Sequence, residues 1–353
     1  MKHFPENLSA KLEIRKRDNA LRQLTVSNKG IDFSSNDYLG FSQSKIIFKE
    51  THEFLINNKI IQNGATGSRL LSGNHRLYLE TEDFIANFHK SETALIFNSG
   101  YDANIGFFGS VPQKGDLILY DELCHASIRD GIQLSNAKAY KFNHNDFEDL
   151  EKLIVRSPNT AIYIVTESVF SMDGDCPNLE ELVLLSNKHH SYLVVDEAHA
   201  LGIFGLKGEG FVQMLGLQDQ IFARSFIYTT GLSPHSVATI LVAYQHLQQD
   251  SAPIFKLREN IVYFNQQKNL LSLKPLFVQS KSAIQSAIIP GNERVKTLAG
   301  QFQEKGFDVK AILSPTVPEG QERLRFCLHN YNSTEEISEV LQLLSTFVFT
   351  PHG

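Results

Sequence analysis

A carboxylate and an imidazole follow one apolar run closely, in the sequence Asp196-Glu197-Ala198-His199 after Val194-Val195. If the run is a fully buried strand, Asp196 is a helix cap or has one of two chemical roles. It could hold magnesium in a nucleotide hydrolase, but that chemistry needs a G-x-x-x-x-G-K-[ST] loop, and the chain has no Gly-Lys pair. Alternatively, Asp196 could keep the ring nitrogen of pyridoxal phosphate protonated, so that the ring acts as an electron sink.

Other apolar runs also end in groups that suit this cofactor. Ser99-Gly100-Tyr101 joins a predicted strand to a predicted helix, where a hydroxyl and free backbone N–H groups favour a phosphate. His125 follows the run that ends at Asp121, and its flat ring could stack on a planar ligand. Ser171 lies in the polar segment after the next run. Because ligands bind at the carboxyl ends of parallel strands, these side chains are predicted to converge on one edge.

The elements that must position these groups alternate between short apolar runs and helical stretches, which indicates an α/β fold with a mostly parallel central sheet. An amphipathic helix is predicted over residues 8–24. The sequence pattern of the C-terminal part indicates a smaller α+β unit. Its last helix is predicted to begin at the capping box Ser333-x-x-Glu336. The other predicted elements are strands Thr93–Asn98, Leu117–Asp121, Ala161–Thr166, Tyr192–Asp196, Phe226–Tyr228, Phe307–Leu313 and Arg323–Leu328, and a helix over residues 292–305.

Length and composition narrow the classes of function. The 353 residues suffice for two domains, and the predicted segments are 1–40 with the first helix, 41–245 with the cofactor, and 246–353 as the small C-terminal domain. The net charge of -6 argues against nucleic acid, and the absence of a long apolar run argues against a membrane. Three scattered cysteines indicate neither disulfides nor a metal site, and we expect a cytoplasmic enzyme.

Taken together and in order, the motifs resemble those of the α-oxoamine synthases, which are fold type I pyridoxal phosphate enzymes. Within the family, the resemblance is strongest to the members that join L-alanine to a pimeloyl thioester, with loss of carbon dioxide, in biotin biosynthesis. Members that use glycine or serine share the cofactor motifs. The acyl carrier, coenzyme A or a carrier protein, is left open. The motifs are Ser34-Ser35-Asn36-Asp37-Tyr38-Leu39-Gly40, Ser99-Gly100-Tyr101, His125-Ala126-Ser127, Ser171-Met172-Asp173-Gly174-Asp175, Asp196-Glu197-Ala198-His199 and Pro315-Thr316-Val317-Pro318.

The resemblance implies a role for each matching residue at the cofactor. Asp196 would pair with the pyridinium nitrogen, and His125 would stack on the ring. Gly100 and Tyr101 would seat the cofactor beside Ser99. Ser171 and His199 would hydrogen-bond near its phenolic oxygen.

Further positions would bind substrate or complete the site across a homodimer. Arg325 would form a forked contact with the carboxylate of the amino acid, a task that suits a planar guanidinium. Arg22 and Thr316 would line the substrate site. Thr229 and Thr230 would reach the cofactor phosphate of the other subunit.

The chain departs from the family at the lysine that binds the cofactor covalently. No lysine occurs over residues 208–255, where the family carries it in a Thr-Phe-Gly-Lys-like turn. Two stretches that flank this segment in relatives run directly into each other, so roughly 30 residues, about one supersecondary unit, are absent near residues 219–225. Lys207, in a glycine-rich loop, is interpreted as a surface residue and not as a substitute.

Two hypotheses follow from the missing lysine. The chain is a synthase by descent whose turnover is doubtful as written, because the lysine also removes the α-proton of the bound amino acid. Alternatively, it is a noncatalytic scaffold, or a lysine-free subunit that pairs with an active relative.

Overall fold

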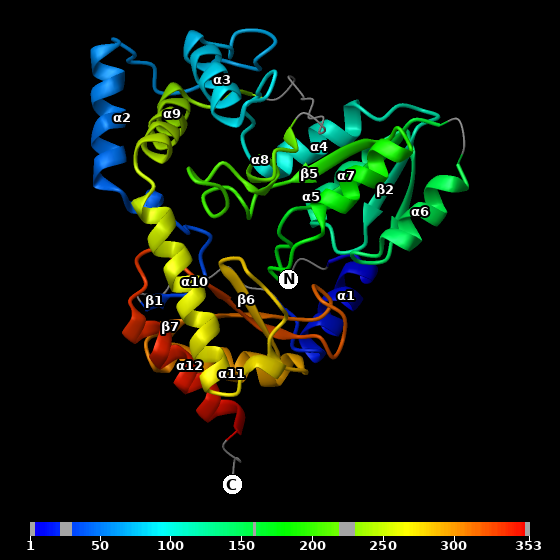
Figure 1. The fold of residues 1–353 in the computed structure, drawn as a ribbon, viewed down its shortest axis with the longest axis vertical. Coiled ribbons are helices and arrows are strands. Elements are labelled where there is room, and N and C mark those ends of the chain that lie inside the picture. The colour runs from blue at the N-terminus through cyan, green and yellow to red at the C-terminus, as the bar shows by residue number, and fades with distance from the viewer. Residues whose placement is uncertain (1–3, 22–29, 158–159, 219–229, 350–353) are drawn as a thin grey trace. The chain divides into compact units, whose positions relative to one another are not determined.

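The computed structural model describes residues 4–21, 30–157, 160–218 and 230–349, and these form two compact units (Figure 1). The first unit joins the two ends of the chain, 1–39 and 255–353, with the short segment 172–175. The second unit contains residues 40–171 and 176–254. The predicted sites on Arg22 and Thr229, the predicted strand Phe226–Tyr228 and the junction at 219–225 lie outside the described residues.

A parallel sheet lies at the centre of the second unit, in the order β3 (Lys138–Phe142), β2 (Leu117–Asp121), β4 (Ile162–Glu167) and β5 (Tyr192–Asp196). The predicted strands at β2 and β5 are confirmed with their bounds, and β4 is shifted by one residue. The mostly parallel α/β architecture predicted from the sequence is therefore confirmed.

Helices cover both faces of this sheet, because alternate side chains of each strand point to opposite faces. Leu117 and Leu119 of β2 pack on the face covered by α6 (Phe147–Val155) and α7 (Leu179–Lys188). Ile118, between them, packs on the face covered by α4 (Gly100–Ser110) and α5 (Ala126–Leu134). The short helix α8 (Phe211–Met214) contributes Val212 to the first of these cores.

One of the strands predicted for the central sheet is not found there. Residues 93–98, predicted as a strand, are not one, because side chains take the backbone hydrogen bonds of Ile96: its N–H donates to Glu82 and its carbonyl accepts from Arg69. Among the described strands, β5 pairs with β4 alone. Its last three residues, Val194 to Asp196, are half-buried, so the prediction of a fully buried strand is wrong.

Three further helices pack together in the second unit. α9 (Pro234–Gln249) lies against α2 (Lys45–Asn57) and α3 (Arg76–His89). Their shared core contains Leu77 and Tyr78 of α3 with Val237 and Leu241 of α9. A short 3₁₀ helix, η1 (Phe41–Gln43), precedes α2.

The first unit is α+β. β1 (Ile31–Asp32) pairs in parallel with β7 (Phe307–Asp308), and an antiparallel sheet has the order β6 (Ile284–Ile288), β9 (Arg323–Cys327), β8 (Lys310–Ile312). The remaining elements are α1 (Glu6–Arg17), most of α10 (Ala252–Leu270), the 3₁₀ helix η3 (Lys274–Leu276), α11 (Asn292–Glu304) and α12 (Thr334–Phe349).

The closing helix begins as the sequence predicts. Ser333 N–H donates to the carboxylate of Glu336 at 2.8 Å, and Glu336 N–H donates to Ser333 Oγ at 3.1 Å, so the capping box of α12 is confirmed. The first helix is shorter than the predicted 8–24: α1 ends at Arg17, and Asn19 adopts the left-handed φ of 51° that stops a helix. The predicted strand 307–313 is divided into β7 and β8.

Two negative findings hold for the described part of the chain. Each helix there is too short or too polar to cross a bilayer. No group of three or more histidine, cysteine or acidic side chains within those same ranges could hold a metal ion.

Candidate active site

Asp196 ends strand β5 and is held by two hydrogen bonds. Asn104 of α4 donates from Nδ2 to Asp196 Oδ2 at 2.9 Å, and Ala198 N–H donates to Oδ1 at 2.9 Å. The same amide of Asn104 lies 3.0 Å from Ser127 Oγ at the start of α5. The carboxylate is thus fixed at the carboxyl edge of the sheet, where a ring nitrogen would need it.

Glu167 ends the neighbouring strand β4 and is almost completely buried. Its carboxylate accepts the N–H of His125 at 2.5 Å and that of Ser171 at 3.3 Å, so it connects two predicted cofactor residues. Burial, with the nearby charge of Asp196, raises the pKa of Glu167 to about 8, although the hydrogen bonds oppose this shift. The site therefore contains one carboxyl group that stays protonated at neutral pH beside Asp196.

Replacing Glu167 by glutamine should flatten the dependence of stability on pH. The pKa of Glu167 is raised from 4.5 to about 8 on folding. Its contribution to the free energy of unfolding is therefore fully present below pH 4.5 and is lost as pH rises through about 8. In that window the wild type should lose up to about 1.4 kcal/mol per pH unit relative to Glu167→Gln. Urea unfolding followed by circular dichroism at a series of pH values measures the difference, and parallel profiles would contradict it.

His125 is the N-cap of α5, and its ring is exposed. Nδ1 accepts the N–H of Ser127 at 3.2 Å and lies 2.8 Å from Ser127 Oγ, which fixes the orientation of the imidazole. An exposed ring held at one edge can present a face to a planar ligand. His199, half-buried, lies in the turn after β5.

The turn before α4 has the features of an anion site. Ser99 caps the helix by accepting Asp102 N–H at 3.0 Å, and a Cβ built on Gly100 would meet no atom within 4 Å. The backbone N–H groups of the first turn are therefore accessible to an anion. Two acidic side chains already engage this region: Ser99 Oγ donates to Asp102 at 2.9 Å, and the Tyr101 hydroxyl donates to Asp130 at 2.5 Å.

A buried ion pair holds the chain that leads into this turn. Arg69 binds Glu82 through both guanidinium nitrogens, at 2.5 and 2.8 Å, and both side chains are about nine-tenths buried. The guanidinium also lies 4.0 Å from the ring centre of Tyr78. Just before the turn, Asn98 Nδ2 donates to the carbonyl of Thr230, which is exposed and bridges to Ser68.

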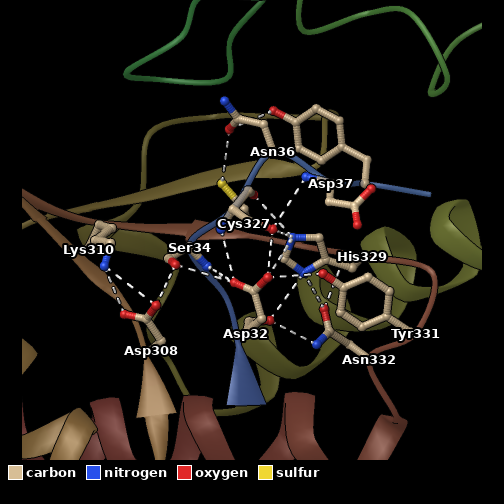
Figure 2. Close-up of polar contacts among 12 residues, drawn as sticks. Asp32, Ser34, Asn36, Asp37, Asp308, Lys310, Cys327, His329, Tyr331 and Asn332 are labelled. Atoms are coloured by element: carbon tan, nitrogen blue, oxygen red, sulfur yellow. Dashed lines mark hydrogen bonds and ion pairs between the residues drawn. The ribbon is translucent and has the colours of Figure 1, made fainter. Parts of the chain in front are cut away.

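In the first unit, Arg325 lies on β9 and is largely buried. Its guanidinium donates to Asn36 Oδ1 at 3.1 Å, and Asn36 belongs to the Ser34–Gly40 motif. The same motif binds a buried histidine, His329, whose Nε2 lies 3.2 Å from Ser35 Oγ. Figure 2 shows His329 beside Asp32, in a cluster of polar side chains that also contains Ser34, Tyr331 and Asn332.

Asp32 is the centre of that cluster. Ser35 Oγ donates to it at 2.6 Å, the Tyr331 hydroxyl donates at 3.0 Å, and the ring of Tyr331 stacks on His329 with centroids 4.7 Å apart (Figure 2). Burial alone would raise the pKa of Asp32, but hydrogen bonds from Ser35 and Ser34 with the charge of His329 hold that pKa well below its usual value. The cluster fixes the segment that contacts Arg325.

Thr316 is exposed and lines a cavity of about 340 Å³ in the first unit. The other lining residues come from the N-terminal segment, from the 172–175 loop, and from β8 and the chain after it; they include Arg15, Ala20 and Met172. This loop is fixed within the same unit, because Arg323 forms a buried ion pair with Asp173 and Ser280 Oγ donates to the Gly174 carbonyl at 2.7 Å.

The structure thus groups the predicted residues in two sets. Those of the second unit lie around the carboxyl ends of β4 and β5 and the starts of α4 and α5, whereas Arg325 and Thr316 belong to the first unit. Sequence reasoning did not single out Asn104, and it placed Glu167 among the polar residues after its strand without giving it a role. A signal for Asn104 existed, because a residue four positions after Gly100 lies on the same side of the helix.

The side chains present fit most of pyridoxal phosphate. Asp196 provides an acceptor for a protonated ring nitrogen, the first turn of α4 suits a phosphate, and the exposed His125 ring suits stacking. The covalent anchor does not fit: no lysine occurs over residues 208–255, and the Lys207 side chain lies on an exposed loop whose N–H donates to Glu209.

Comparison with known proteins places the chain in a family. Residues 28–233 match the family model described as aminotransferase class I and II. A curated relative from Emericella nidulans, named 8-amino-7-oxononanoate synthase, is 37% identical and is covered over 94% of its length by 95% of this chain. One of the same name from Lysinibacillus sphaericus is 32% identical, with 95% of this chain and 93% of the relative covered.

Solved structures agree with this fold. A serine palmitoyltransferase from S. paucimobilis superposes with a TM-score of 0.85 at 26% identity, covering 97% of this chain and 96% of that one. An 8-amino-7-oxononanoate synthase from Francisella tularensis has a TM-score of 0.73 at 26% identity, covering 91% and 98%. The alignment with the Emericella relative runs over 388 positions, more than the 353 residues here, so that relative has residues without a counterpart in this chain.

Proposed function

The chain belongs to the 8-amino-7-oxononanoate synthase family, biotin-pathway enzymes within the class I and II aminotransferases, and we propose that it retains the cofactor half of their active site without the covalent lysine. The reaction of this site is the decarboxylative condensation of L-alanine with a pimeloyl thioester. It proceeds at a useful rate only when a lysine-bearing segment is supplied near residues 219–225. We place it in the cytoplasm, in a homodimer to which Thr229 and Thr230 contribute from the other subunit.

One observation carries this proposal: Asp196 is fixed at the end of β5 by Asn104, next to the first turn of α4. Pyridoxal phosphate, when bound, withdraws electrons from the amino acid that it carries. Asp196 would hold the proton on the ring nitrogen, and the N–H groups after Ser99 would hold the phosphate. His125 would cover one face of the ring and exclude water from it.

The remaining residues would act on the substrate. Arg325 suits the carboxylate of L-alanine, because a guanidinium binds it with two parallel hydrogen bonds. No lysine occurs over residues 208–255 to act as the base, so the α-proton lacks an efficient acceptor. General-base catalysis contributes about 10²–10⁴-fold to rates, and turnover should fall at least that far.

The full chain should bind pyridoxal phosphate without forming a reducible bond to an active-site lysine. Equilibrium dialysis should detect retention of the cofactor, and Asp196→Asn should weaken it by about tenfold or more, since a charge-assisted hydrogen bond contributes about 1.5–3 kcal/mol. Asp116→Asn is the matched control, because Asp116 lies just before the start of β2, away from the carboxyl edge of the sheet where Asp196 lies. Peptide mapping after borohydride treatment checks for a lysine adduct. Equal affinities of Asp196→Asn and wild type, or an adduct on Lys207, would contradict the proposal.

A second candidate function, a lysine-free subunit that pairs with an active relative, is favoured by the same missing lysine. Mixing the chain with a lysine-bearing relative distinguishes this candidate function from the first. If the chain is such a subunit, it should form a heterodimer with a lysine-bearing relative and raise the relative's turnover. If it is a synthase by descent, only its own repaired form should gain activity.

A further inference from the structure

A second cavity, of about 650 Å³, lies in the first unit between α10 and the segment from η3 to residue 281. Three lysines line it: Lys268 from α10, Lys274 from η3 and Lys281. Amide side chains and Phe277 form much of the rest, and no carboxylate occurs among the residues that line it. Its volume falls in the range of sites that bind small molecules.

Lys268 differs from the other two because it is only 5% exposed. Its ammonium donates to Gln285 Oε1 at 3.1 Å and lies 4.8 Å from the ring centre of Phe277. Gln285 is held in this orientation by its own Nε2, which donates to the carbonyl of Ser282 at 3.0 Å. The two side chains that contact the buried ammonium, Gln285 and Phe277, are therefore both neutral.

A buried ammonium among neutral groups is electrostatically unfavourable. Burial, with the charge of Lys274, lowers the pKa of Lys268 to about 8. An oxyanion between these two lysines would relieve both effects, since it attracts each cation and screens their repulsion. The apolar wall formed by Phe277, Ile261 and Val262 would favour an anion with an apolar body over a bare inorganic one.

We propose that this cavity binds a small organic oxyanion, with its carboxylate, sulfonate or phosphate head on Lys268 and Lys274 and its apolar body against Phe277. The site lies within the first unit and uses none of the residues assigned above to the cofactor or substrate. It would make the small domain a ligand-binding module of its own. The proposal for this cavity therefore does not depend on the proposed synthase function.

Benzenesulfonate and inorganic sulfate are suitable probes, because neither changes its charge at neutral or mildly alkaline pH. Calorimetry on the full chain should show benzenesulfonate binding more tightly than sulfate. Lys268→Met should weaken benzenesulfonate about tenfold or more, as expected for the loss of a charge-assisted contact. The wild-type affinity should fall as pH rises past about 8, where Lys268 loses its proton. Lys274 and Lys281 are the other titratable groups that line the cavity.

Lys256→Met is the matched control, since it removes the same charge from an exposed position of the same helix that does not line the cavity. It should change the affinity less than twofold, well below the effect of a close charge contact. If Lys268→Met does not fold, Lys274→Met, at an exposed position, should still weaken binding and move the pH midpoint upward. Equal effects of the Lys268 and Lys256 variants, or no effect of the Lys274 variant, would overturn the proposal.

Discussion

Inserting a segment with the family-like Thr-Phe-Gly-Lys turn between Arg224 and Ser225 should create an active synthase. Alanine-dependent release of thiol from pimeloyl-coenzyme A should rise by at least about 10²–10⁴-fold over the chain as it stands, the contribution expected of a general base. At the same time, borohydride should fix pyridoxal phosphate to the inserted lysine. Thiol release is followed with a thiol reagent, and the attachment site by peptide mapping.

The physical reason for so large an effect is that one amine performs two tasks. It binds the cofactor covalently, and it then accepts the α-proton of the amino acid. The segment should also pair with β5, whose outer edge meets no partner among the described strands. The inserted variant should therefore be more stable as well as active, because backbone groups on a sheet edge gain hydrogen bonds.

The control is the same insertion with its lysine changed to alanine. It should gain the stability and not the activity, which separates the chemical role of the segment from its structural role. Glycine and serine in place of L-alanine test the choice among amino acids. A folded insertion variant that binds the cofactor but releases no thiol with any of the three would contradict the family's reaction for this chain.

The parts of the fold that could be predicted are those with a local signal at both ends. The bounds of β2 and β5 follow from apolar runs that stop at Asp121 and Asp196, and the start of α12 follows from its capping box. The end of α1 was predicted wrongly because it depends on the backbone conformation of Asn19. The spacing of apolar residues carries no information about that conformation.

The residues of the candidate site also differ in how far a local sequence signal predicts them. Asp196 and His125 could be chosen as candidates because polar residues at strand ends stand out from the apolar runs before them. Glu167 ends a strand too, but its role depends on the N–H groups of His125 and Ser171, which come from two other loops. Contacts of this kind are set by the packing of strands far apart in sequence, so a single sequence carries little signal for them.

The Arg69–Glu82 pair is the strongest case of a contact that the sequence hides, and breaking it should be severely destabilising. Arg69→Met leaves a buried carboxylate without its cation, which costs about 3–5 kcal/mol. That is a large part of the roughly 5–15 kcal/mol by which proteins are stable. Urea unfolding followed by circular dichroism measures the loss, a suitable probe since the chain has no tryptophan.

Arg76→Met is the matched control, because Arg76 forms an exposed pair with Glu80 and should cost no more than about 1 kcal/mol. Changing both partners, in Arg69→Met with Glu82→Gln, should cost less than the sum of the single changes, since neither charge is left alone. Because Glu82 also binds the N–H of Ile96, just before the Ser99 turn, the single variants should bind pyridoxal phosphate more weakly as well. Equal stabilities of the Arg69 and Arg76 variants would show that the pair does not hold this turn.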